Sequence, residues 1–102
     1  MKIIKKLSHL IEDELHMSEI YIDKALEYNE EYPGVAKTLY QISMQEMSHV
    51  EMLHKEVAEL IEQYRSEHGD PPVEMMAVYN YLHKKHIRHA SSIKVKQQMF
   101  KG

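Results

Sequence analysis

Residues 39–64 read LYQISMQEMSHVEMLHKEVAELIEQY, and apolar residues recur in this stretch every three or four positions. That spacing is typical of an amphipathic α-helix, because it places one residue from each turn on the same face. The pattern extends over residues 34–66, directly after Pro33, which suits the first turn of a helix. Two polar residues, Glu46 and His49, interrupt the middle of this apolar stripe.

Two further segments have helical spacing. Residues 3–29 carry a long apolar stripe with Glu14 near its centre, and residues 73–100 carry a weaker one. The sequence HGDPP at residues 68–72 separates the second and third segments, because a Gly followed by paired prolines stops a helix. We therefore predict an all-α fold in a single domain over residues 1–102. Its first two helices form a long antiparallel hairpin, and the third packs on that hairpin.

The composition excludes several classes of protein. The chain of 102 residues contains no Cys, which removes disulfides, zinc fingers and thiol catalysis. No apolar run approaches the roughly 20 residues of a membrane span, and the first residues do not suit a signal peptide. We therefore expect a cytoplasmic protein with no membrane partner.

The charge is distributed unevenly along the chain. Residues 7–74 hold all 16 acidic residues and four basic ones, a net charge of −12, whereas residues 75–102 hold six basic residues and no acid. Few aromatic residues lie among the basic ones, which disfavours a nucleic-acid partner. We expect this basic segment to dock on the acidic helices instead.

Glu46-x-x-His49 places a carboxylate and an imidazole one turn apart on a single helix face, and Glu14 lies on the stripe of the partner helix. Burying two carboxylates without a cation is costly, and oxygen ligands with one nitrogen suit iron or manganese. These three residues are the predicted metal ligands. A second copy of the pattern, Glu51-x-x-His54, is rotated roughly 140° from the first at about 100° per residue, so we interpret it as solvated surface.

At these residues the chain resembles the ferritin-like superfamily, on its rubrerythrin and encapsulated-ferritin side. Glu14 and Tyr21 match the family pattern in EDELHMSEIYIDKAL, and Glu46 and His49 match it in YQISMQEMSHVEML. The resemblance implies a di-iron centre that reacts with O2 or peroxide, with iron oxidation as the usual activity. It also implies that Tyr21 is a hydrogen-bonding partner of the site rather than a ligand.

The chain departs from the family by lacking the second Glu and the second Glu-x-x-His of a full four-helix member. It also lacks a Cys-rich iron domain like that of rubrerythrin. This half-length design looks like encapsulated ferritins, where two chains complete one site. We therefore expect a homodimer, or a higher homo-oligomer, that forms a four-helix bundle around two iron ions, with manganese as the alternative metal.

The position of the first helix's end decides which of its carboxylates faces Glu46. If that helix ran unbroken to Tyr32, Glu19 would be level with Glu46. If it ends near Asn29, Glu14 is level instead. We predict the early end, and Glu19 is the alternate ligand.

Two histidines of the third segment, His83 and His86, are also alternate ligands because they lie three residues apart. We interpret them as residues that hydrogen-bond across a helix interface. The rival to the di-iron hypothesis is a metal-free helical module for self-assembly, so the sequence leaves open whether the protein is an enzyme.

Overall fold

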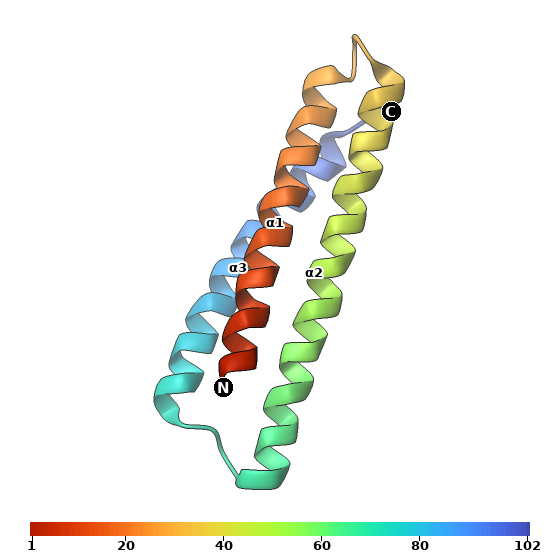
Figure 1. Ribbon diagram of the computed structural model, residues 1–102. Helices are drawn as coiled ribbons and strands as arrows, with labels where there is room; N and C mark the ends of the chain where they lie inside the picture. The colour runs from red at the N-terminus through yellow and green to blue at the C-terminus, as the bar shows by residue number, and fades with distance from the viewer.

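Three helices and no strand make up the computed structural model, which describes residues 1–102 (Figure 1). α1 spans Lys2–Tyr28, α2 spans Pro33–His68 and α3 spans Val73–Met99. The predicted all-α fold is confirmed, and each helix begins and ends within two residues of its predicted range. None of the three helices combines the length and the hydrophobicity that a membrane crossing requires.

The connection between α1 and α2 is short and begins where we predicted. α1 ends at Tyr28, Asn29 follows it as the C-cap residue, and residues 29–31 form a turn. The backbone N–H of Tyr32 donates to the carbonyl of Tyr28 at 2.8 Å, which closes this turn. Pro33 then begins α2, where its missing N–H is not needed. The early end of α1 favours Glu14 over Glu19 as the residue level with Glu46.

α2 ends at a glycine in a left-handed conformation. Gly69 has φ of 81°, and its backbone N–H donates to the carbonyl of Arg65 at 3.0 Å. An L-residue with a Cβ rarely adopts this φ, so Gly is the residue that this C-terminal stop requires. The prolines at 71 and 72 then carry the chain to α3.

The helices lie side by side in an elongated bundle of 56 × 18 × 18 Å (Figure 1). α2 runs antiparallel to α1, and α3 returns in the direction of α1. α3 packs mainly on α1 and touches α2 less. One long side of the α1–α2 hairpin is therefore covered by α3, and the opposite side is not.

The core contains residues of the predicted stripes, such as Val57 and Ile93, and two residues of α1 that those stripes did not include, Leu15 and Ile22. Leu15 and Ile22 of α1 are fully buried, together with Val57 of α2 and Ile93 of α3. The stripe that we drew along α1 instead passed through Glu14 and Tyr21, which are only half-buried. The reason is that α1 packs on two neighbours, so its buried face is turned toward α3.

A buried polar junction fixes the level of the three helices. The hydroxyl of Ser43 donates to the carbonyl of Ser18 at 2.7 Å, and the hydroxyl of Ser18 lies 2.9 Å from the carbonyl of Ser43. Gln97 of α3 donates its amide to the Ser43 hydroxyl at 3.0 Å. All three side chains are buried and hydrogen-bonded, as buried polar groups must be.

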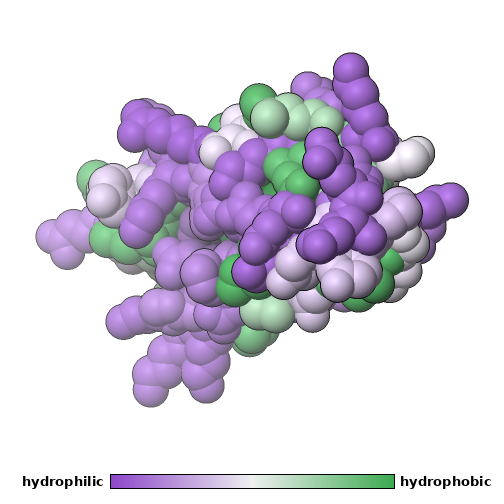
Figure 2. Space-filling view, turned by 90° about the horizontal axis from the view of Figure 1, so that it is seen from above, coloured by the Kyte–Doolittle hydropathy of each residue, from purple (hydrophilic) through white to green (hydrophobic).

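The basic α3 docks on acidic residues of the hairpin, as expected. Lys96 lies 2.9 Å from Asp23 and 3.3 Å from Glu19, and Lys94 lies 3.9 Å from Glu51. Apolar contacts accompany these ion pairs. They include a stack of Phe100 on Tyr40 with ring centroids 4.6 Å apart. From the end that carries the α1–α2 turn, long hydrophilic side chains project outward and apolar groups lie between them (Figure 2).

Candidate metal centre

Glu14, Glu46 and His49 come together on the hairpin. Each offers a ligand atom, and these atoms all lie within 4.8 Å of one another. The Nδ1 atom of His49 lies 3.4 Å from a carboxylate oxygen of Glu14 and 3.7 Å from one of Glu46. The structure therefore brings together the three residues that the sequence predicted as ligands.

Local structure explains this convergence. Glu46 and His49 are one turn apart on α2, so both project from the same face. The Ser18–Ser43 junction sets α1 and α2 level with each other. The helices are antiparallel, so a residue four positions before Ser18 on α1 is level with a residue about four positions after Ser43 on α2. Glu14 therefore lies beside Glu46 and His49.

The cluster lies at the surface of the single chain, on the side that α3 does not cover. The exposed fractions of the side chains are 21% for Glu46, 30% for Glu14 and 49% for His49. Glu12 and Glu19, which contact α3, are rotated from Glu14 by roughly 160° and 140° at about 100° per residue. The expectation of ligands buried inside a bundle is therefore not met within one chain.

The charges at the cluster are not balanced. Neither Glu14 nor Glu46 forms an ion pair with a Lys or Arg, and the imidazole of His49 is the nearest basic group to both. Two neighbouring carboxylates repel each other unless a cation lies between them. Their oxygens and one imidazole nitrogen suit iron or manganese, so the donor set fits the metal that the sequence predicted.

Tyr21 lies on the same face of α1 as Glu14, two turns further along the helix. Its side chain is half-buried, and its hydroxyl makes no hydrogen bond within the chain. A direct hydrogen bond from Tyr21 to a ligand of its own chain is therefore not present.

Glu19 does not belong to the cluster. One of its carboxylate oxygens lies 3.2 Å from the Nε2 atom of His89, and the other accepts a hydrogen bond from Lys96 at 3.3 Å. Burial by itself would raise the pKa of Glu19, but the hydrogen bonds from His89 and Lys96 outweigh it, so the pKa is lowered. Glu19 is therefore a residue on which α3 docks. It is not the carboxylate level with Glu46, because α1 ends before Tyr32.

His83 and His86 also lie away from the cluster, at the interface of α3 with the hairpin, but only His86 makes the hydrogen bond that we predicted for both. The Nε2 atom of His86 lies 3.2 Å from a carboxylate oxygen of Glu12. The ring of His83 stacks on His54 with centroids 4.3 Å apart, and its buried Nδ1 atom has no hydrogen-bond partner. Burial, and then the charge of His86, lower the pKa of His83.

His54 corrects one interpretation of the sequence. We assigned Glu51-x-x-His54 to solvated surface, and Glu51 is exposed, but His54 is half-buried beneath α3. Burial is the main cause that lowers the pKa of His54, followed by the charges of His83 and His86. The rotation argument placed Glu51 correctly. It failed for His54 because the side that α3 covers was not known.

Comparison with known proteins adds no further information: no family model, no curated protein and no solved structure matches the chain.

Proposed function

We propose that the protein is a di-metal carboxylate protein of the ferritin-like type. In this proposal Glu14, Glu46 and His49 hold iron, and two chains pair to complete the site. One observation carries the proposal: the carboxylates of Glu14 and Glu46, which have no Lys or Arg partner, converge with the imidazole of His49. Manganese is the alternative metal, because it prefers the same ligands.

The surface around the cluster supports pairing of two chains. We call this surface the open face. Apolar side chains border the three polar residues on both helices, at spacings of three and four: Leu10, Met17, Leu39, Ile42 and Leu53. Leu10 is 48% exposed and Met17 is 39% exposed. Such a row of half-exposed apolar residues is the packing seam of a four-helix bundle, and a second copy would bury it.

Pairing also completes the ligand set. One chain offers two carboxylates and one imidazole, whereas two chains related by a two-fold axis offer four carboxylates and two imidazoles. The second set is absent from α3, whose histidines bind or stack on residues of α1 and α2. We therefore expect one metal per chain and two per dimer.

The chemistry follows from the donor set. A pair of ferrous ions, when bound, would supply two electrons, enough with two protons to reduce O2 to H2O2 or H2O2 to two waters. The carboxylates of Glu14 and Glu46 would hold the ions and offset their charge, and His49 would provide one nitrogen ligand from each chain. Pairing on the open face excludes water from the site.

Metal content and assembly state test this proposal together. Wild type, Glu46→Gln and the control Glu51→Gln are loaded anaerobically with Fe(II), and iron per chain and molecular mass are measured. Glu51 is a matched control because it begins the second Glu-x-x-His and is exposed. We expect about one iron per chain in the dimers of wild type and Glu51→Gln, and at least a tenfold loss in Glu46→Gln.

The same experiment also tests the rival function, a metal-free module for self-assembly. The half-exposed apolar residues of the open face favour that function equally. A stable dimer with no iron in any of the three proteins would overturn the di-metal proposal and leave self-assembly. A monomer that binds two irons by itself would overturn the shared site.

A further inference from the structure

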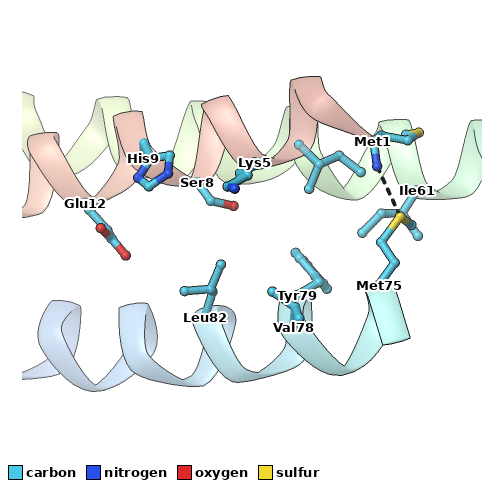
Figure 3. Close-up of a pocket in the computed structure, with 11 residues that line it drawn as sticks. Met1, Lys5, Ser8, His9, Glu12, Ile61, Met75, Val78, Tyr79 and Leu82 are labelled. Atoms are coloured by element: carbon cyan, nitrogen blue, oxygen red, sulfur yellow. Dashed lines mark hydrogen bonds between the residues drawn. The ribbon is translucent and has the colours of Figure 1, made fainter. Parts of the chain in front are cut away.

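A second feature of the bundle lies on its other side, between the first three turns of α1 and the first turns of α3. The two helices do not close on each other there, and a slot of about 450 Å³ remains (Figure 3). Ile61 of α2 contributes to its lining as well. Small-molecule sites in proteins are commonly apolar cavities of roughly 300–1,000 Å³, so this slot has the right size for one.

The two walls of the slot differ in chemistry. The α3 wall is apolar and presents Met75, Val78, Tyr79 and Leu82. The α1 wall is mixed: it carries the apolar side chains of Met1 and Ile4 and four polar ones, Lys5, Ser8, His9 and Glu12. Figure 3 shows Ser8 and Glu12 directed toward α3. Burial raises the pKa of Tyr79, which is consistent with a wall that excludes water.

Two cationic groups line the slot: the side chain of Lys5 and the N-terminal ammonium of Met1, which donates to Sδ of Met75 at 3.3 Å. Lys5 makes no ion pair within the chain, whereas Glu12, at the end of the slot, is joined to His86 at 3.2 Å. An anionic group on a ligand would therefore be attracted to the end of the slot that holds Lys5 and Met1, rather than to the end that holds Glu12. His9 lies one turn from Lys5 on the same helix and offers a second nitrogen donor.

We propose that this slot binds one medium-chain fatty acid, or a closely similar amphipathic carboxylate. The acyl chain lies along the apolar α3 wall, and the carboxylate pairs with Lys5. The slot runs along α1 from Met1 to Glu12, which is roughly 16 Å at about 1.5 Å per residue, so its occupant is elongated.

The dimensions select a small molecule over a protein segment. A helix with its side chains is about 10 Å across, and a piece as long as the slot would occupy more than twice the volume available. The site is also separate from the proposed metal centre, because Glu14, Glu46 and His49 lie on the side of the hairpin that α3 does not cover. The proposal therefore stands or falls independently of iron binding.

Calorimetric titration of the full chain with dodecanoate, below its micelle concentration, tests the site. We expect one dodecanoate per chain. In the series octanoate, decanoate, dodecanoate, affinity should rise about fourfold per methylene, because each is buried against the α3 wall. Dodecyltrimethylammonium has the same tail and the opposite charge, and should bind at least tenfold more weakly.

Two pairs of variants identify the residues. Lys5→Glu should weaken dodecanoate binding at least tenfold and favour dodecyltrimethylammonium. Lys6→Glu makes the same change of net charge outside the slot and should leave binding unchanged. Leu82→Trp fills the slot and should abolish binding, with helix content checked by circular dichroism. If this variant does not fold, Val78→Phe at an exposed position narrows the same slot.

Binding that is absent in wild type, or that is equal in wild type, Lys5→Glu and Leu82→Trp, would overturn the proposal. So would a dodecanoate affinity that does not depend on chain length. If Leu82→Trp changes the oligomeric state and no dodecanoate binds to wild type, the slot belongs to an interface between chains, and the fatty-acid site is refuted.

Discussion

The two long sides of the α1–α2 hairpin both carry glutamates and histidines, but the two sides treat them differently. Under α3, Glu19 is bound by His89 and Lys96. On the open face, Glu14 and Glu46 share one imidazole and have no other basic neighbour. Under α3 the acidic residues find basic partners on α3, whereas the open face offers its two carboxylates no Lys or Arg.

This difference shows that a residue pattern is not a site until its neighbours are known. Glu-x-x-His occurs twice in α2, one copy on each side of the helix. In one copy Glu46 and His49 meet Glu14, and in the other Glu51 lies near Lys94 while His54 stacks on His83. Only the first copy brings two carboxylates together without a Lys or Arg beside them.

We expect the largest loss of folding stability from a substitution on the side that α3 covers. Ile93→Ala should destabilise the fold by about 2–5 kcal/mol, because Ile93 is fully buried where α3 meets the hairpin. Leu39→Ala on the half-exposed open face should cost less than half as much in the isolated chain. Urea unfolding of both variants measures this, and equal losses would mean that the two sides do not differ in packing.

Ferrous iron should stabilise the folded chain by binding on the open face and not on the side under α3. At a free concentration about a hundredfold above its Kd, a metal that binds only the folded state adds about 2.7 kcal/mol. Thermal unfolding with and without Fe(II), under argon, should show this gain in wild type and no gain in Glu14→Gln. Glu12→Gln is the control on the covered side and should keep the gain. A gain in Glu14→Gln equal to that of wild type would exclude Glu14 as a ligand.

Acid should weaken the covered side first. The folded-state pKa values of His54 and His83 are both lowered, so below about pH 6.5 the unfolded chain binds more protons than the folded one. Their contribution to stability is therefore complete above pH 6.5 and is lost as the pH falls through the folded-state values. Urea midpoints between about pH 5 and pH 8 should show this slope. His54→Gln should reduce it, and the exposed His68→Gln should not; an unchanged slope in His54→Gln would contradict the assignment.

The smallest effects should come from the ion pairs that dock α3. Lys96 contacts Asp23 and Glu19 and is about a third exposed, so Lys96→Met should cost about 1 kcal/mol. Lys94 and Glu51 are more than half exposed and 3.9 Å apart, so Lys94→Met should cost less than about 0.5 kcal/mol. Urea unfolding at low and high salt measures both losses of stability. Because salt screens charges, the loss in Lys96→Met should become measurably smaller at high salt, whereas the loss in Lys94→Met is too small to change measurably. A larger loss in Lys94→Met would reverse the order that burial predicts.

Several features were predictable because they depend on residues close in sequence. The apolar spacing predicted the three helices, and the end of α1 followed from matching Glu14 with Glu46 across the turn. The convergence of Glu14, Glu46 and His49 was predictable for the same reason, since two antiparallel helices joined by a short turn have a fixed register.

The partners of the remaining charged residues were not predictable, since they depend on where α3 lies. Glu19 resembles Glu14 in its sequence position, and His54 resembles His49 because each follows a Glu by three residues. Both Glu19 and His54 nevertheless face α3. The burial of Leu15 and Ile22 was missed because α1 was treated as packing on α2 alone. Serines at 18 and 43 gave no sequence signal for the junction that they form.

The sequence by itself therefore determined three helices, their hairpin register and the convergence of Glu14, Glu46 and His49, because short-range periodicity and a short turn decide all of these. The tertiary structure decided which side of the hairpin α3 covers. That choice depends on packing between residues more than 60 positions apart, such as Glu12 with His86 and Ser18 with Gln97. It pairs the acids on one side and leaves the cluster of Glu14, Glu46 and His49 exposed on the other.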